Sequence, residues 1–120
     1  MDYVINVPRL DWLIGGSRIG GTYNTYYGSC GTDGEKGFLG RKIFNYMIRI
    51  EKIIDENADE DTPEDEKMIE VIKASVYSGY NSFDNTDPDS IETEVFDLEE
   101  NSRPIIKAWI EQKCREYFAQ

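Results

Sequence analysis

The chain has 120 residues, of which 39% are apolar and 12% aromatic, and this fits one domain whose core needs no disulfide or metal. Its 13 basic and 24 acidic residues give a net charge of -11, which argues against nonspecific binding to a nucleic-acid backbone. The chain has no histidine, so Ser-His-Asp and Cys-His catalytic pairs and histidine-ligated metal sites are excluded.

The first part of the chain is predicted to be a sheet over about residues 2–54. Two short β-prone runs, 2–7 and 10–14, precede a glycine-rich turn over 15–21, and a third run over 22–27 alternates like a strand. Residues 28–40 hold five glycines and predict a loop. Residues 41–54 fit either a strand or a helical stripe, and we favour the strand because β-branched isoleucines suit a pleated surface.

The second part of the chain is predicted to hold two helices and a strand. Thr62-Pro63-Glu64-Asp65 combines an N-cap hydroxyl, a proline at the first helical position and acids near the helix start, which predicts a helix over about 63–78. Residues 80–90 predict a polar loop. Residues 91–98 predict a strand, and its acidic side chains are typical of a sheet edge.

The last predicted element is a helix over about 103–118. Five residues repeat at helical spacing, so Cys114 is expected in the core: Ile106, Trp109, Ile110, Cys114 and Tyr117. The fold-class prediction is therefore α+β: a single domain over 1–120, with an antiparallel sheet of four to five strands and two amphipathic helices packed on it.

The cysteines, the first residues and the apolar runs of the chain together predict a cytoplasmic protein. Cys30 and Cys114 are far apart and show no Cys-x-x-Cys spacing, so we expect cytosolic thiols. Met1-Asp2-Tyr3 has no basic stretch followed by an apolar run, and no window approaches the roughly 18 uninterrupted apolar residues of a membrane span. We therefore expect neither a signal peptide nor contact with a membrane.

Acidic residues gather in two blocks, with ten between 51 and 70 and eight between 84 and 100. Solvated loops and helix starts are one interpretation. The other is an imitation of nucleic-acid phosphates that occupies a basic groove of a protein partner, as some anti-CRISPR proteins do. The stretch from Asp55 to Glu66 echoes a calcium loop, but Glu60 stands where that loop needs glycine, so we expect no metal.

Aromatic and cationic residues are the candidate ligand contacts. Tyr23, Tyr26 and Tyr27 lie on a polar predicted strand near Arg18, a mixture that suits a nucleobase and a phosphate. Packing of these tyrosines in the core and at its rim is the alternative. Arg103 and Lys107, together with the free amides at the start of the last predicted helix, form a second candidate anion site.

The sequence offers little for catalysis. Cys30 has no histidine to activate it, and the spacing of Glu92 and Glu94 is equally that of an exposed edge strand. An enzyme that works through these groups is an alternative, but we expect no catalytic residue and no cofactor.

The segment Arg18-Ile-Gly-Gly-Thr-Tyr-Asn-Thr-Tyr-Tyr-Gly-Ser-Cys-Gly31, followed by a strand near 41–50 and a C-terminal amphipathic helix, resembles the small phage-encoded Thoeris anti-defence sponge proteins. The likeness spans most of the chain, and Gly-Gly-Thr-Tyr-Asn-Thr is its most specific part. It implies a protein that sequesters cyclic ADP-ribose isomers in the host bacterial cytoplasm without cleaving them. It also implies a homodimer or a higher homo-oligomer with its pockets at the interface between copies, and some members of the family also bind cyclic oligonucleotides.

The resemblance also suggests ligand contacts, because the family uses an aromatic and an asparagine. The matching loop here offers Phe83 with Asn81 or Asn85. Together with the residues above, the expected ligand-binding set is Arg18, Asn24, Tyr27, Phe83, Asn85, Arg103 and Lys107.

Overall fold

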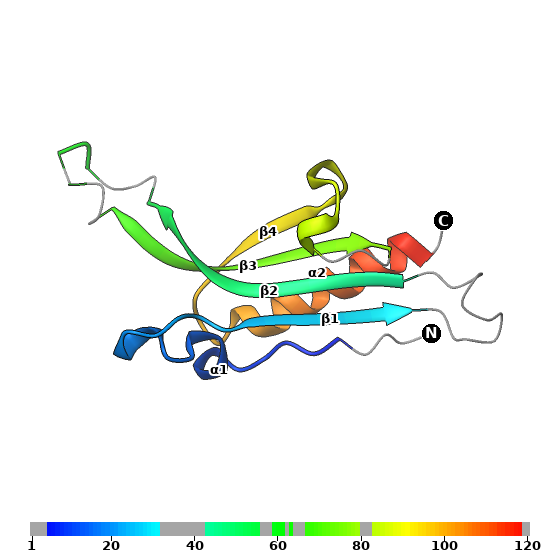
Figure 1. Cartoon of the computed structure of the whole chain (residues 1–120), viewed down its shortest axis with the longest axis horizontal. Coiled ribbons are helices and arrows are strands. Elements are labelled where there is room, and N and C mark those ends of the chain that lie inside the picture. The colour runs from blue at the N-terminus through cyan, green and yellow to red at the C-terminus, as the bar shows by residue number, and fades with distance from the viewer. Residues whose placement is uncertain are drawn as a thin grey trace.

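The chain forms an antiparallel sheet with a long helix across one face, as a computed structural model shows (Figure 1). The structure describes residues 5–31, 43–55, 59–61, 63, 67–79 and 83–118. In chain order the elements are α1 (Leu10–Ile14), a 3-10 turn (Ser17–Ile19), β1 (Thr25–Gly31), β2 (Ile43–Ile54), β3 (Met68–Ser78), two 3-10 turns (Phe83–Asn85 and Pro88–Ser90), β4 (Glu92–Asp97) and α2 (Ser102–Phe118).

Within the described residues, four strands pair in the order β1-β2-β3-β4, and each neighbouring pair is antiparallel. β2 and β3 form a long central hairpin that runs from Phe44 opposite Ser78 to Ile54 opposite Met68. The far end of this hairpin projects beyond the two shorter strands (Figure 1). The predicted α+β fold class is confirmed, since the described residues form a four-stranded antiparallel sheet and two α-helices. Of these two helices, α1 is short.

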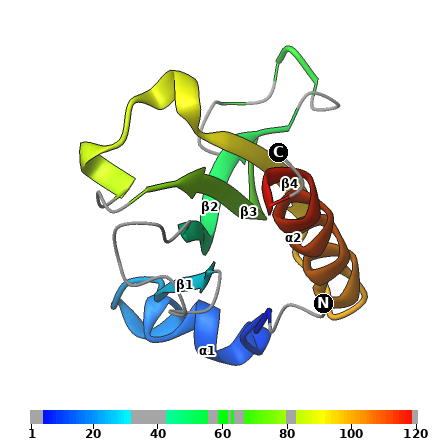
Figure 2. The same cartoon turned by 90° about the vertical axis from the view of Figure 1, so that its right-hand side faces the viewer.

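α2 covers one face of the sheet, as Figure 2 shows. Its residues Ile106, Ile110 and Cys114 recur every four positions, so they form one stripe, and all three are buried. Burial of an isoleucine side chain contributes roughly 1.5–3 kcal/mol, so this stripe anchors the helix. The strand residues that complete the core alternate along β2 and β3: Phe44, Tyr46, Ile48, Ile50, Ile72, Ala74 and Val76.

Polar contacts fix how α2 begins and how it lies on β4. The Ser102 hydroxyl donates a hydrogen bond of 2.7 Å to the Asp97 carbonyl, and this joins the first turn of the helix to the end of β4. Farther along, the Lys113 ammonium lies 2.6 Å from a Glu92 carboxylate oxygen. The predicted helix over 103–118, the predicted strand over 91–98 and the buried position of Cys114 are all confirmed. β4 is also the outermost of the described strands on its side of the sheet, as its acidic residues predicted.

Residues 68–78 form β3, so the predicted helix over about 63–78 is wrong. β3 is a central strand, and both of its faces are largely buried: Val71, Ile72, Ala74, Ser75, Val76 and Tyr77. A strand that is buried on both faces loses its polar-apolar alternation, and its apolar residues then also fit helical spacing. Residues 62 and 64–66, which carried most of the capping signal, lie outside the described residues.

Residues 10–14 form α1 and not the predicted strand. Asp11 lies in the first turn of α1 and accepts a hydrogen bond of 2.9 Å from the backbone nitrogen of Trp12. Gly15 ends the helix at a φ of 56°, a conformation that favours glycine. Residues 5–7 belong to no strand either, and residues 2–4 lie outside the described part.

β1 starts at Thr25, later than the predicted strand over 22–27, and it continues through four residues that were predicted as loop. Residues 32–40 of that predicted loop lie outside the described residues. The interpretation of 41–54 as a strand is confirmed by β2.

Candidate functional site

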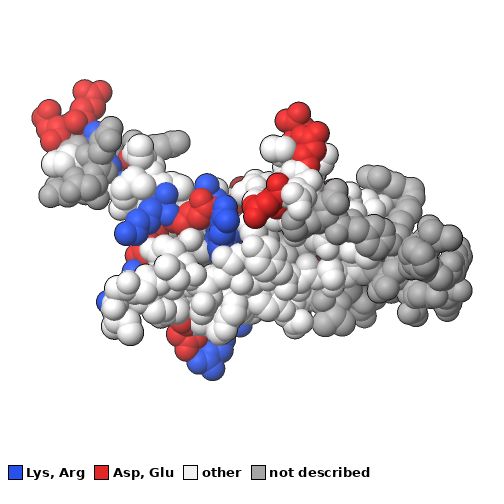
Figure 3. Space-filling model, viewed as in Figure 1, with Lys and Arg blue, Asp and Glu red and all other residues white. Residues whose placement is uncertain are grey.

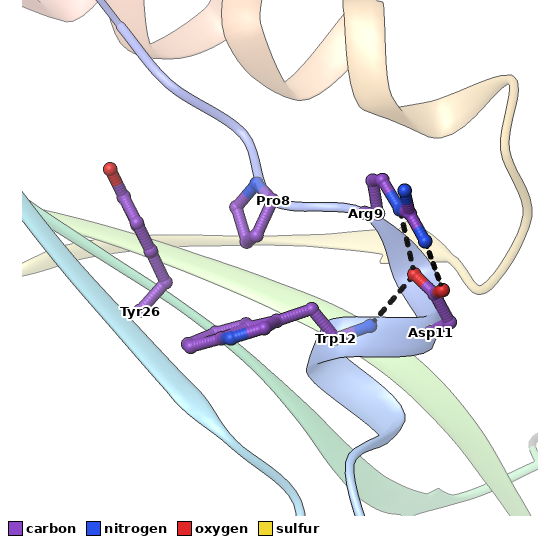
Figure 4. Close-up of a pocket in the computed structure, with 5 residues that line it drawn as sticks. All are labelled: Pro8, Arg9, Asp11, Trp12 and Tyr26. Atoms are coloured by element: carbon purple, nitrogen blue, oxygen red, sulfur yellow. Dashed lines mark hydrogen bonds and ion pairs between the residues drawn. The ribbon is translucent and has the colours of Figure 1, made fainter.

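An aromatic hollow lies between α1 and β1. Trp12 projects from α1 and meets Tyr26 of β1 edge to face, with ring centroids 5.9 Å apart (Figure 4). Pro8 borders the same hollow, which measures about 510 Å³. Trp12 is 44% exposed although it is one of the largest apolar side chains, so its ring is available for contact with another molecule.

An ion pair stands at the rim of this aromatic hollow. The Arg9 guanidinium donates two hydrogen bonds to the Asp11 carboxylate, one of 3.1 Å from Nε and one of 2.5 Å from Nη2. The hydrogen bond from Arg9 lowers the pKa of Asp11, and the same bond raises the pKa of Arg9. Both groups therefore stay charged and largely cancel each other, which leaves the aromatic hollow close to neutral.

A second hollow, of about 400 Å³, lies at the start of α2 and is cationic. Arg103 and Lys107 line it together with Glu100, Pro104 and residues 5–7. The Arg103 Nη2 atom donates a hydrogen bond of 2.9 Å to the Val7 carbonyl, and Nη1 lies 3.2 Å from Glu100. Its Nε atom is buried and has no hydrogen-bond partner in the described part of the chain.

The segment 5–9 borders both the aromatic hollow and the cationic one. Pro8 and Arg9 belong to the first hollow, and Ile5, Asn6 and Val7 belong to the second. The segment is held on two sides, because Arg103 bonds to the Val7 carbonyl and the Asn6 backbone nitrogen donates to the Tyr46 hydroxyl at 3.1 Å. An aromatic surface and two cationic side chains are thus placed along one anchored stretch of backbone.

The structure therefore brings together two of the predicted site residues, Arg103 and Lys107. Arg18 lies elsewhere and is not among the described residues that line this hollow. Its Nη1 atom is 2.8 Å from the Glu70 carboxylate of β3, which also accepts a hydrogen bond from the Tyr23 hydroxyl. These two donors, Arg18 first, lower the pKa of Glu70.

Asn24 supports the aromatic hollow and does not line it. Its side-chain amide donates a hydrogen bond of 2.7 Å to the Trp12 carbonyl, and its backbone nitrogen donates to the Leu13 carbonyl at 3.0 Å. Asn24 thus ties the end of α1 to the approach to β1.

Tyr27, Phe83 and Asn85 are placed away from both hollows. Tyr26 pairs with Ile48 of the α2-side core, so the next residue, Tyr27, points to the opposite face of the sheet, where it is 61% exposed. Phe83 packs edge to face on Tyr77 with centroids 5.7 Å apart, and the Arg49 guanidinium lies 5.6 Å from its ring centre.

Asn85 is exposed in the turn that follows Phe83, and Asn81 lies outside the described residues. The seven predicted residues therefore do not form one site within a single copy of the chain. Trp12 and Arg9, which border the aromatic hollow, were missed by sequence reasoning. The available sequence signal was a tryptophan directly after Pro-Arg-Leu-Asp.

Searches for a metal site and for a membrane span find neither in the described residues. No group of three or more potential ligand side chains is gathered there, although part of the acidic stretch between Asp55 and Glu66 lies outside the description. No described helix has both the length and the apolar character needed to cross a bilayer. Comparison of the chain with protein-family models, with curated proteins and with solved structures finds no match.

Proposed function

We propose that the protein is a non-catalytic binding protein that sequesters a cyclic nucleotide signal of the cyclic ADP-ribose class and thereby suppresses a bacterial anti-phage defence. In this proposal it acts in the host bacterial cytoplasm and belongs with the Thoeris anti-defence sponges. The observation that carries the proposal is the placement of an aromatic hollow and a cationic hollow along successive parts of segment 5–9.

Each hollow suits one part of a nucleotide. A base that stacks on the ring of Trp12 gains about 1–3 kcal/mol, and such stacking tolerates any base because every base has a π-face. Among the described residues, Lys107 supplies the uncompensated positive charge for phosphate oxygens, and Arg103, which is paired with Glu100, adds a second charged group beside it. Hydrogen bonds between charged groups are stronger than those between neutral ones. The ion pair of Arg9 with Asp11 keeps the aromatic hollow near neutral, which favours the uncharged base there and the phosphates near Lys107.

Sequestration needs tight binding and slow release. Competition with a receptor of nanomolar affinity requires about -12 kcal/mol of binding free energy. Stacking and two charged contacts supply about 4–9 kcal/mol of this value, so the rest has to come from further contacts, such as those from a second copy of the chain. The pocket also has to be ordered before binding, because ordering it on binding would consume part of the gain. The hydrogen bonds that hold Asn6 and Val7 in place provide this order for the segment that borders both hollows.

The proposal includes a homodimer or a larger homo-oligomer. Arg18, Tyr27, Phe83 and Asn85 lie outside both hollows of one copy, so they take part in binding only if a second copy brings them to the site. Light scattering coupled to size exclusion tests this, and a strictly monomeric protein that still binds the ligand would remove these four residues from the proposed site.

Isothermal titration with cyclic ADP-ribose and its isomers tests the function. We expect tight binding, with the ligand recovered intact by mass spectrometry after denaturation of the protein. Trp12→Ala and Lys107→Ala should each weaken binding by about fivefold or more, since each removes one contact worth about 1–3 kcal/mol. Absence of heat at micromolar wild-type protein would refute the proposal.

Two control variants match these substitutions. Ile19 is 91% exposed and Lys52 is an exposed lysine of β2, and neither lines a hollow described above. Ile19→Ala and Lys52→Ala should therefore bind as the wild type does. Equal losses in the control and test variants would show that the hollows are not the site.

A second candidate function rests on the acidic surface. Figure 3 shows acidic side chains gathered over the segment between β3 and β4. From the end of β3 to the end of β4, six acidic residues are exposed: Asp84, Asp87, Asp89, Glu92, Glu94 and Asp97. Such a row imitates the charge of a phosphate backbone and suits a basic groove of a protein partner.

Displacement of fluorescent duplex DNA from a purified CRISPR nuclease tests this second candidate. The wild type should displace the DNA in a manner that weakens with added salt. A variant that combines Asp89→Asn, Glu94→Gln and Asp97→Asn should displace it less well, whereas Trp12→Ala should leave displacement unchanged. Displacement that is insensitive to the three neutralised carboxylates would refute this candidate.

A further inference from the structure

Cys30 and Cys114 lie side by side in the folded chain although 84 positions separate them in the sequence. Cys30 comes near the end of β1, and Cys114 belongs to the buried stripe of α2. Their Sγ atoms are 2.8 Å apart, and both thiols are free. The sequence spacing showed no sign of this pair, because the contact depends on how α2 crosses the sheet.

Packing on either side holds the two sulfurs together. Cys30 pairs with Phe44 in the register of β1 and β2, and the Phe44 ring stacks on Tyr117 with centroids 5.0 Å apart. Tyr117 lies about one helical turn beyond Cys114. The strand and the helix are therefore joined by an aromatic contact next to the thiols, and this limits how far the sulfurs can separate.

The surroundings make the two thiols unequal. Cys30 is half-buried, whereas Cys114 is fully buried. The hydrogen bond with Cys114 lowers the pKa of Cys30. The same hydrogen bond is the largest cause that raises the pKa of Cys114, and burial is the second. Cys30 is consequently the thiol that ionises first and, as the less buried of the two, the one that a small oxidant reaches first. Cys114 is placed to attack the oxidised Cys30 sulfur.

We propose that Cys30 and Cys114 are a reversible modification site, in which a peroxide converts them to an intramolecular disulfide that ties β1 to α2. The Cys30 thiolate attacks one oxygen of hydrogen peroxide, so that an S–O bond forms, the O–O bond breaks and one water leaves after protonation. The Cys114 sulfur then attacks the Cys30 sulfur, the S–O bond breaks and a second water leaves with the Cys114 proton. Two thiols and one peroxide thus give one disulfide and two waters, and the peroxide takes both electrons.

Little movement is required for this step. A disulfide needs its sulfurs about 2.05 Å apart, so the pair has to close by less than about 1 Å, which small side-chain rotations supply. The bond would close a loop that spans most of the described sheet, so it constrains the unfolded chain strongly. This inference does not depend on the proposed ligand, because neither cysteine lines the hollows beside segment 5–9.

Treatment of the purified full chain with hydrogen peroxide tests the proposal. Intact-mass measurement should show the loss of two hydrogens, and non-reducing peptide mapping should link the peptides that hold Cys30 and Cys114. The melting temperature should rise by several degrees and return to its first value after reduction. Glutathione disulfide in place of peroxide should give the same linked peptide, since thiol exchange reaches the same product.

Cys30→Ser is the matched variant, because it removes the attacking thiolate and retains a small polar side chain. It should show neither the mass loss nor the shift in melting temperature. Oxidation of the wild type to a sulfinic acid, a disulfide between two chains, or unchanged thiols at a peroxide excess would each overturn the proposal. If Cys30→Ser does not fold, the peptide map of the wild type still decides between these results.

Discussion

Gly28 is the position at which one added methyl group should disturb the fold most clearly. It lies in β1 opposite Tyr46 of β2, and the Tyr46 ring rests directly over it. A Cβ atom built on Gly28 would lie 2.7 Å from the Tyr46 Cε1 atom and closer still to Cζ and the hydroxyl oxygen. Real Cβ atoms essentially never approach other atoms so closely, so Gly28→Ala forces the ring or the strand to move.

The ring has little room to move. Tyr46 is 1% exposed, its hydroxyl accepts a hydrogen bond from Asn6, and the Tyr26 ring lies beside it at 6.1 Å between centroids. Overpacking of this kind costs about 1–3 kcal/mol. Replacement of a strand glycine returns about 0.5–1 kcal/mol, which leaves a net loss of up to about 2.5 kcal/mol. Because the Tyr46 ring is held on several sides, we expect a net loss of about 1–2 kcal/mol for Gly28→Ala.

Thermal unfolding followed by circular dichroism measures this loss. An unfolding entropy of about 2.1 cal/mol/K per residue over 120 residues converts it to a fall in melting temperature of about 4–8 °C. Gly16→Ala is the matched control, because a Cβ there meets its nearest neighbour at 3.7 Å, an ordinary contact. A Gly28→Ala variant as stable as the Gly16→Ala control would refute the packing of Tyr46 over β1.

Three further predictions concern stability. Ile110→Ala should lower the free energy of unfolding by about 2–5 kcal/mol in denaturant titrations, because the side chain is fully buried, whereas Ile105→Ala, at a residue 57% exposed, should cost less than about 0.5 kcal/mol. Burial raises the pKa of Tyr46 from 10.0 to about 12, so this phenol ionises at a lower pH in the unfolded chain than in the folded one. Stability should therefore fall as the pH rises from about 10 to about 12. Tyr46→Phe should reduce this fall in thermal melts at alkaline pH. Because the pKa of Glu70 is lowered from 4.5 in the folded chain, the stability that its ion pair contributes is present above pH 4.5 and is lost as the pH falls through the lowered value. Glu70→Gln should therefore weaken the dependence of stability on acid pH. An unchanged acid profile would contradict the contact with Arg18.

The fold was predictable where one element has a single covered face. In β2, alternation over Phe44, Tyr46 and Ile48 left a helix possible, and the β-branched isoleucines decided for a strand. The four-residue repeat of Ile106 and Ile110 marks α2, because one side of this helix meets the core. β3 was mispredicted because both of its faces are covered, so burial itself removed the pattern on which the prediction depended.

The candidate site was less predictable because its contacts are long-range. Arg103 and Lys107 lie one helical turn apart, so the C-terminal helix alone brings them together. Trp12 reaches Tyr26 only because α1 folds back on β1, and nothing in the local pattern of either segment shows this. Arg18 likewise finds Glu70 across 52 positions, where sequence reasoning had assigned it to a ligand.

β4 closes one margin of the described sheet, and one row of its backbone groups consequently faces away from β3. An unpaired edge strand of this kind is a template to which strands of other molecules can add, and such pairing can lead to fibres. Because Glu92, Glu94 and Asp97 all carry exposed carboxylates there, two copies that approach through this margin set like charge against like. The acidic side chains of this short strand thus oppose edge-to-edge pairing between copies of the chain. This electrostatic protection should be weakest in concentrated salt, which screens charges on neighbouring molecules from each other.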